Sequence, residues 1–195
     1  MPYKELCCNL GIKYVSHDFD LYDGRGDVPG FRELDYVVPI HDIVCDITEL
    51  IESNYDFALL TEVLEHVPDP VKALESSLRT LRKDGLMLVT VPLRSHIHQA
   101  PFFFASGLSP YFFFHHQETL GYRVIRCQVI GDQVDYLARE VPKLISSKGF
   151  WRLNWQHLCF KLIRKLARRI RTHMPQEILT SGGFSTFAII QKVRN

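Results

Sequence analysis

The segment Glu62-Val63-Leu64-Glu65-His66 follows an apolar run and carries three side chains that can do chemistry. If the segment is helical, Glu62, Glu65 and His66 lie on one face, because residues three and four apart are neighbours on a helix. A histidine can then act as a general base, since its pKa lies near neutral pH. Two carboxylates and an imidazole can equally bind a divalent metal ion.

A second group of histidines lies farther along the chain, at His96, His98, His115 and His116. We predict His66 and His98 as catalytic residues, with His98 contacting the acceptor, and a hydrogen-bonded structural histidine is the alternative for each. His96 or His98 is also a candidate further metal ligand. The simpler interpretation has no metal, with Glu62 and His66 ordering a loop and Glu65 facing solvent. We favour that interpretation at this stage.

Apolar segments that precede the acidic residues predict strands. Residues 12–19 and 41–47 are rich in β-branched and aromatic side chains and end near Asp18 and Asp46. Residues 55–61 form a nearly continuous apolar run, which is typical of a central strand with both faces covered. That strand ends at Thr61-Glu62. Residues 86–92 predict a further buried strand, which Pro92 ends.

Caps and periodicity predict the helices. Asp69 is a helix cap with Pro70 at the first helical position, and Val71, Leu74, Leu78 and Leu81 form the expected buried stripe. Ser109-Pro110 repeats this pattern before a helix that ends near Gly121. The remaining predicted elements are a helix end at 4–11, a loop at 20–36, a turn at 82–85, strands at 122–130 and 182–193, and a helix at 133–147.

Strands alternating with helices predict an α/β fold with a doubly wound, mostly parallel sheet. In such sheets a ligand binds at the carboxyl ends of the strands. Asp18, Asp46, Thr61-Glu62 and Pro92 all occupy predicted strand ends. We therefore expect their side chains to meet around one binding crevice.

Length and composition limit the function classes. The chain has 195 residues and a formal net charge of +1, which indicates one domain over residues 1–195 and argues against nucleic acid as a partner. No apolar run is long enough to span a membrane, and the N-terminus has no apolar signal core. The five cysteines follow no pairing pattern, so we expect reduced thiols and a cytoplasmic protein.

Residues 138–180 differ in character and are predicted to form a basic helical insertion before the last strand. Residues 160–175 contain six lysines and arginines and no acid, with leucines and isoleucines at helical spacing. We favour a packed helix with a solvated cationic face. Peripheral contact with an anionic membrane through residues 151–172 is the first alternative, and binding of nucleic acid phosphates is the second.

The stretch DFALLTEVLEHVPDPVKALESSLRTLRKDGLMLVTVP, residues 56–92, resembles class I S-adenosylmethionine-dependent methyltransferases of the EVLEH type. The resemblance covers about residues 1–135 and implies a Rossmann-like fold. Lys83-Asp84-Gly85 departs mildly from the family's usual Pro-Gly-Gly turn. Residues 95–124 also resemble a bacterial subgroup with an aromatic-rich insertion after the strand at 86–92, and the aromatic loop at 101–116 would cover the acceptor pocket.

The resemblance implies a role for each matching position. Asp18 would accept hydrogen bonds from the ribose hydroxyls of S-adenosylmethionine, which suits a carboxylate because both hydroxyls are donors. Asp46 would accept the adenine amino group, and Ile47 would lie on the adenine ring. Thr61 and Glu62 would end the strand that runs beneath the cofactor. Phe102–Phe104 and Phe112–Phe114 are candidates for lining the acceptor pocket, with a place in the core as the alternative.

The implied reaction is methyl transfer to a small-molecule, glycan or lipid acceptor, whose identity the sequence does not specify. In the family, one more strand and a glycine-rich loop precede the matched residues, and that strand lies between the strands at 12–19 and 55–61. We therefore expect an N-terminally truncated form with impaired cofactor binding. A non-catalytic relic that acts as a binding or membrane-surface protein is the alternative. The sequence does not indicate an oligomeric state.

Overall fold

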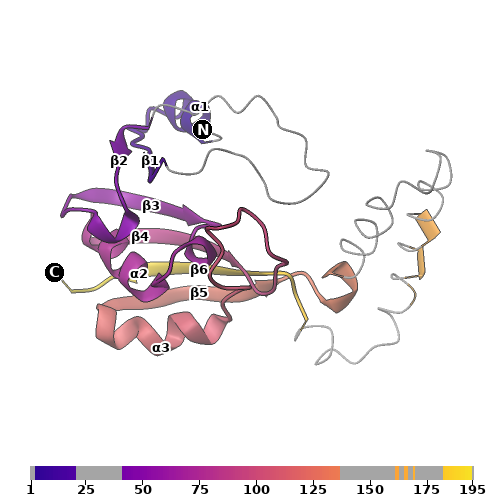
Figure 1. Ribbon diagram of the computed structural model, residues 1–195. Helices are drawn as coiled ribbons and strands as arrows, with labels where there is room; N and C mark the ends of the chain where they lie inside the picture. The colour runs from indigo at the N-terminus through magenta and orange to yellow at the C-terminus, as the bar shows by residue number, and fades with distance from the viewer. Residues whose placement is uncertain are drawn as a thin grey trace.

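The computed structural model describes residues 3–20, 41–136 and 182–194, together with residues 161, 162, 165, 166 and 169. In these residues the strands form two sheets (Figure 1). The smaller sheet pairs β1 (His17–Asp18) with β2 (Ile43–Val44). The larger sheet has the order β3-β4-β6-β5, formed by Tyr55–Thr61, Leu81–Pro92, Ser185–Lys192 and Tyr122–Ile130.

In the larger sheet, three of the four strands point the same way, so their carboxyl ends lie at the same end of the sheet. β3 and β4 are parallel, and β6 is antiparallel to both β4 and β5. It follows that β3, β4 and β5 run in the same direction and that only β6 opposes them. The Rossmann-like α/β fold with a mostly parallel sheet is therefore confirmed. Loops that follow β3 and β4 emerge side by side, where the sequence predicted a ligand site.

Local signals set the helix boundaries. The longer helices are α2 (Pro70–Arg79) and α3 (Pro110–Leu120), with the short α1 (Lys4–Asn9) near the start of the chain. Asp69 caps α2 as predicted, because its Oδ1 accepts a 2.9 Å hydrogen bond from the Lys72 N–H. Gly121 ends α3 with φ 70°, a left-handed conformation that glycine adopts at little cost. Ser109 precedes α3 without a side-chain cap bond.

One hydrophobic core lies between the larger sheet and its helices. α2 and α3 cover the same face of the sheet, since their buried side chains belong to one cluster with those of the strands. The members with the least exposure are Leu64, Ala73, Leu74, Met87, Val89, Val91, Phe113, Ala188 and Ile190. Leu81 joins this core from the start of β4, so its predicted place in the α2 stripe is wrong. Val71 is only half-buried.

The first two strands are much shorter than predicted. Within 12–19 only His17–Asp18 is a strand, and within 41–47 only Ile43–Val44. Before this pairing, side-chain hydrogen bonds join the two segments. The Ser16 N–H and hydroxyl each donate to Asp42 Oδ2 at 2.8 Å. Beyond β2, Asp46 caps the 3₁₀ helix η1 (Ile47–Glu49), which ends the extended backbone.

The prediction that β3 is a central strand covered on both faces is wrong. β3 is an edge strand of the four-stranded sheet, and Phe57 and Leu59 are 49% and 38% exposed. Among the described residues, β1 and β2 form a sheet of their own, and neither pairs with β3. The turn predicted at 82–85 is an irregularity inside β4, because Tyr55 pairs with Leu81 whereas Phe57 pairs with Leu86.

Several predicted segments lie wholly or partly outside the described residues. These are the loop at 20–36 beyond Asp20, the helix at 133–147 beyond its helical start at 133–136, and most of the basic insertion at 138–180. Lys161, Leu162, Lys165, Leu166 and Arg169 are helical and exposed. Peripheral membrane contact through 151–172 stays a prediction. No helix in the described parts of the chain is long and apolar enough to cross a membrane.

Candidate functional site

The 3₁₀ helix η2 (Leu64–His66) presents the acidic motif at the carboxyl end of β3. Glu62 leaves the strand with φ 54°, and its N–H donates to the Thr90 carbonyl at 2.8 Å. This turn directs the chain inward, so that Glu65 is 0% exposed. The expectation that Glu65 faces solvent is therefore wrong, because the sharp turn after Thr61 places it beneath the following loop.

The segment between β4 and α3, residues 93–109, folds back onto η2. The Glu65 carbonyl accepts hydrogen bonds from the N–H groups of Phe104 at 2.9 Å and Ala105 at 3.2 Å. His66 Nδ1 donates to the Phe102 carbonyl at 2.6 Å. These bonds bring His98 to His66, with the two ring centroids 4.7 Å apart. The two histidines predicted as catalytic therefore lie together, although the chain separates them by 32 positions.

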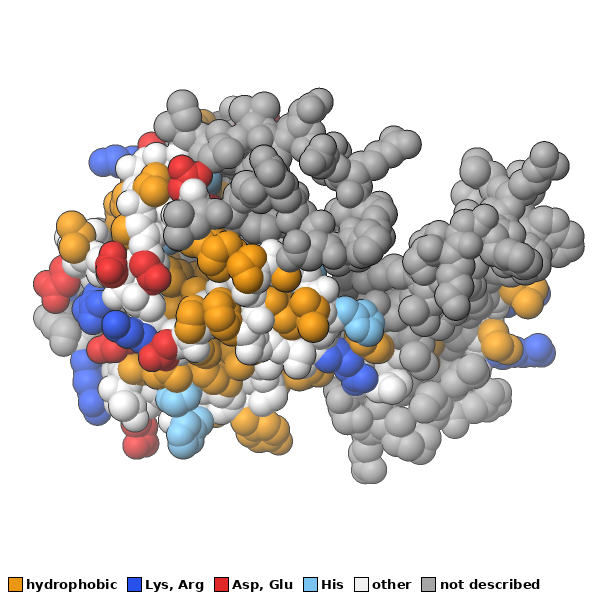
Figure 2. Space-filling model, viewed as in Figure 1, with side chains coloured by type: hydrophobic (Ala, Val, Ile, Leu, Met, Phe, Trp, Pro, Cys, Tyr) orange, Lys and Arg blue, Asp and Glu red, His pale blue; other side chains and the backbone are white. Residues whose placement is uncertain are grey.

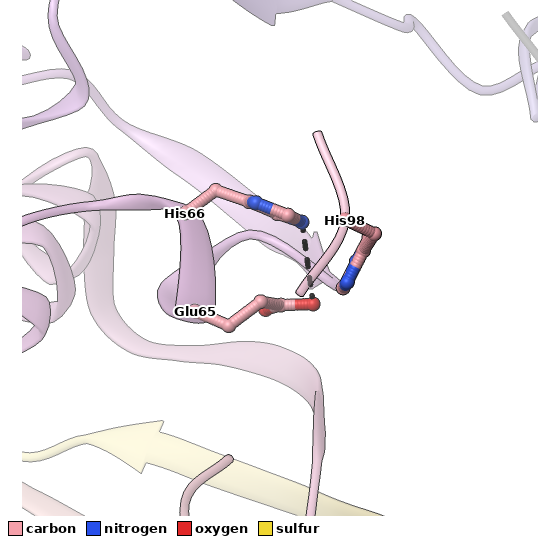
Figure 3. Close-up of side chains that lie close together, drawn as sticks. All are labelled: Glu65, His66 and His98. Carbon is pink, nitrogen blue, oxygen red and sulfur yellow. Dashed lines mark ion pairs between the residues drawn. The ribbon is translucent and has the colours of Figure 1, made fainter. Parts of the chain in front are cut away.

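Figure 3 shows Glu65 and His66 projecting from η2 toward His98 on the facing segment. His66 Nε2 lies 3.6 Å from Glu65 Oε1. Burial, together with the charge of Glu62, raises the pKa of Glu65 to about 7. Burial and the neighbouring His98 lower the pKa of His66, against the opposing effect of its bond to Phe102. Both shifts favour neutral forms, so at pH 7 the imidazole is neutral and the carboxyl group is only partly ionised, and the contact is not a full ion pair.

Aromatic contacts join the end of β1 to the same segment. Phe19 packs edge-on against Phe102, with 5.0 Å between the ring centroids. Phe103 lies 5.0 Å from the His98 ring. Figure 2 shows apolar side chains gathered on this part of the visible surface, over the segment between β4 and α3. The end of the smaller sheet and the end of the larger sheet therefore meet at one set of aromatic rings.

Asp18 directly precedes this aromatic contact. Its side chain is 41% exposed, and its Oδ2 lies 3.8 Å from His41 Nε2. The other oxygen, Oδ1, accepts a 2.9 Å hydrogen bond from the Asp20 N–H. A carboxylate with this exposure at a strand end can still accept hydrogen bonds from a ligand.

Asp46 stands at the end of the neighbouring strand, β2. Its Oδ1 accepts hydrogen bonds from the N–H and the hydroxyl of Thr48, both at 2.8 Å. These two bonds, the backbone one first, hold the pKa of Asp46 below its ordinary value. Ile47 is only 7% exposed and packs in the core, where the Ser76 hydroxyl donates to its carbonyl.

The other residues predicted for the site lie at a strand end, on α3, in the hydrophobic core or at the exposed surface. Thr61 pairs with Thr90 at the end of β3, and Glu62 is exposed beside it. His115 and His116 contact each other on α3, with 4.7 Å between their ring centroids, and neither joins the Glu65 cluster. The aromatic runs also divide, since Phe113 is a core residue whereas Phe104 is 51% exposed.

Sequence reasoning missed two contributors to the site. Phe19 carries the contact between the sheets, and Ser95 contacts His98 Nδ1 at 3.2 Å. The closeness of Ser95, His96 and His98 in the sequence was a weak signal for the second contact. No signal in the sequence indicated the first, because it depends on how two loops pack.

A model of the methyltransferase domain family matches residues 15–173 of the chain. No curated protein matches the sequence. A solved S-adenosylmethionine-dependent methyltransferase from Archaeoglobus fulgidus has 16% identity and a TM-score of 0.51, and the match covers 97% of this chain and 80% of that one. This likeness shows the shared fold.

Two further solved structures match less closely. A putative sarcosine dimethylglycine methyltransferase from Galdieria sulphuraria has 15% identity and a TM-score of 0.44, over 78% of this chain and 60% of that one. Phosphoethanolamine N-methyltransferase 2 from Haemonchus contortus has 13% identity and the same TM-score, over 78% and 38%. The chain thus spans less than two thirds of the length of these two proteins.

Proposed function

Because the chain belongs to the methyltransferase domain family, we propose that it transfers a methyl group from S-adenosylmethionine to a small-molecule, glycan or lipid acceptor. The cofactor would supply an electrophilic methyl group. An acceptor oxygen or nitrogen would attack its carbon in line with the breaking methyl–sulfur bond, and S-adenosylhomocysteine would leave. The chain's own task is then to hold the two reactants in this alignment, and positioning of this kind contributes most of the rate.

The single observation that carries the proposal is that the end of β1 and the loop after β3 both contact the segment between β4 and α3. Phe19 follows Asp18 and packs on Phe102, whose carbonyl accepts the hydrogen bond from His66. The carboxylate that ends β1 and the histidine after β3 therefore belong to the same edge of the molecule. Ligands of α/β proteins bind at this edge.

The residues present fit the nucleoside end of the cofactor. Asp18 is the last residue of β1, and Asp46 follows β2, the strand parallel to it; both side chains keep oxygen atoms accessible to ligand donors. In the proposed complex, Asp18 accepts from the ribose hydroxyls and Asp46 from the adenine amino group. Thr61 and Glu62 form the floor at the end of β3. Ile47 is the apolar neighbour on the adenine side, and only its small exposed part can touch the ring.

The acceptor would approach from the His66–His98 side. Both rings lie beside Phe103, which provides an apolar wall for a small molecule. With its lowered pKa, His66 is largely neutral at pH 7, so its free ring nitrogen can take the proton that an acceptor hydroxyl or amine releases. His98 is the second candidate for this role.

Calorimetry with S-adenosylmethionine tests the proposal directly. Asp46→Asn keeps the cap on η1, because asparagine caps as well as aspartate, but removes the charge. We expect Asp18→Asn and Asp46→Asn each to weaken cofactor binding about 10- to 100-fold, the value of one charge-assisted hydrogen bond. Asp56→Asn, at the opposite end of β3, is the matched control and should bind normally.

Transfer of a tritiated methyl group to pooled small molecules, glycans and lipids would then identify the acceptor class. Wild-type protein that binds no S-adenosylmethionine would overturn the enzymatic proposal and support the non-catalytic alternative. Transfer to RNA alone would contradict the acceptor class, although it would leave methyl transfer in place.

A further inference from the structure

Glu65 has a buried carboxyl group that the cofactor roles do not use. Its side chain is 0% exposed, and neither Oε1 nor Oε2 has a hydrogen-bond partner. A buried polar group without a partner costs free energy, and a buried carboxylate costs more than a neutral group. The hydrogen bonds from Phe104 and Ala105 go to its backbone carbonyl and leave the carboxyl group unpartnered. These two unpartnered oxygen atoms point to a ligand that the side chain would bind.

Two imidazole rings, those of His66 and His98, face this carboxyl group. Their hydrogen bonds fix which ring nitrogen carries the proton. His66 Nδ1 lies 2.6 Å from the Phe102 carbonyl, and His98 Nδ1 lies 2.9 Å from the His96 carbonyl. A carbonyl oxygen only accepts, so each Nδ1 must carry the hydrogen. In the neutral rings the lone pair is consequently on Nε2. Metal-binding histidines are commonly held this way, with the other ring nitrogen donating to a backbone carbonyl.

We propose that Glu65, His66 and His98 bind a divalent transition-metal ion. One ligand atom from each of the three residues lies within 4.8 Å of the other two, and their side chains converge in Figure 3. Two ligands of one tetrahedral zinc ion, each about 2.0–2.2 Å from it, are about 3.3–3.6 Å apart. The 3.6 Å between His66 Nε2 and Glu65 Oε1 matches that spacing without rearrangement.

The ligand set indicates which ions suit the site. Two imidazoles and one carboxylate favour zinc or iron(II), whereas magnesium and calcium prefer oxygen ligands alone. Three protein ligands also leave at least one position for water or another oxygen atom, as in catalytic zinc sites. Zn²⁺ is therefore the first probe, with Mg²⁺ as the comparison.

The bound ion would change the part that His66 and His98 play. A nitrogen whose lone pair binds a metal cannot also accept a proton from a methyl acceptor. In the metal-bound protein the two rings thus hold the ion, and their proposed role as proton acceptors applies only to the metal-free protein. Metal binding itself does not depend on the proposed methyl transfer, so the two proposals can fail separately.

The test uses the full chain without an affinity tag, freed of metal with a chelator. Calorimetry should show one Zn²⁺ per chain with a dissociation constant of micromolar or tighter, and Zn²⁺ should raise the melting temperature. Mg²⁺ at the same concentration should bind much more weakly. Co²⁺ should give visible absorption typical of nitrogen and oxygen ligands without thiolate bands, which excludes binding at the cysteines.

Variants assign the ligands. Glu65→Gln and His98→Gln should each weaken Zn²⁺ binding more than about 100-fold, since even the supporting shell of a metal site is worth 10- to 100-fold. His115→Gln on α3 and Glu75→Gln on α2 are the matched controls and should bind Zn²⁺ as the wild type does. If Glu65→Gln does not fold, His98→Gln alone tests the ligand assignment. His98 lies on a partly exposed segment, so its substitution should leave the fold intact.

Two results would overturn the metal proposal. One is a wild-type protein that neither binds Zn²⁺ nor changes its melting temperature. The other is binding that persists in Glu65→Gln and His98→Gln, which would place the ion elsewhere. Calorimetry with S-adenosylmethionine runs in parallel. Zinc binding without cofactor binding would leave this proposal intact and contradict only the proposed function.

Discussion

The ring of His66 donates from Nδ1 to the carbonyl of Phe102 at 2.6 Å, across 36 positions of sequence. This bond ties η2, which follows β3, to the segment that follows β4. The bond orients the His66 imidazole, and the same segment places His98 next to that ring. Every proposed role of the two histidines, as proton acceptors or as metal ligands, depends on this one attachment.

Phe19 and Phe102 should couple the two sheets energetically. Their edge-on contact at 5.0 Å is of the kind that contributes about 0.5–1.5 kcal/mol beyond the buried area. A double-mutant cycle with Phe19→Leu and Phe102→Leu, measured by urea denaturation, should give an interaction energy in this range. Phe104→Leu with Phe19→Leu is the control pair and should be additive, because Phe104 is 51% exposed. Additive free energies for Phe19 and Phe102 would show that the contact does not couple the sheets.

Asp69→Ala should lower the free energy of unfolding by about 1 kcal/mol, because it removes the acceptor for the Lys72 N–H at the start of α2. Asp69→Asn should be nearly neutral, since asparagine caps a helix equally well. Urea denaturation of both variants measures the difference. Equal losses for alanine and asparagine would show that the charge of Asp69, rather than its cap bond, stabilises the helix.

Tyr122→Phe should cost about 0.5–1.5 kcal/mol of stability, the value of one intramolecular hydrogen bond. The buried Tyr122 hydroxyl donates to the Phe113 carbonyl at 2.6 Å, and the substitution removes this bond from the core. Thermal unfolding measures the loss. Tyr111→Phe on α3, the helix that contains Phe113, is the control, because Tyr111 is 80% exposed and should tolerate the change. An unchanged melting temperature for Tyr122→Phe would show that the hydroxyl bond does not stabilise the fold.

Cys127 should resist alkylation until the pH is high. Burial raises the pKa of its thiol to about 11, and the thiolate is the reactive form. Iodoacetamide followed by peptide mass spectrometry should label the exposed Cys8 first at pH 8, with Cys127 labelling increasing up to about pH 11. Because the folded pKa is raised, the thiol's contribution to stability is present at lower pH and lost as the pH rises through about 11. Equal labelling of both cysteines at pH 8 would contradict the burial.

Sequence patterns were sufficient for the elements whose signals are local. The cap at Asp69-Pro70, the stop at Gly121 and the apolar runs at 55–61 and 122–130 depend on residues within a few positions of each other. Strand alternation with helices was sufficient for the α/β class. The EVLEH motif and its surroundings were sufficient for the family, which the domain match supports independently.

Tertiary structure decided what the motif residues do. Edge strands and central strands can have the same apolar sequence pattern, so only the sheet order showed that β3 lies at an edge. Spacing predicted one helix face for Glu62, Glu65 and His66, and the favoured interpretation left Glu65 in solvent. The turn at Glu62 and the fold-back of residues 93–109 instead buried the Glu65 carboxyl group without a partner. The meeting of Glu65, His66 and His98 depends on hydrogen bonds between segments more than 30 positions apart, and periodicity carries no information about contacts of that range.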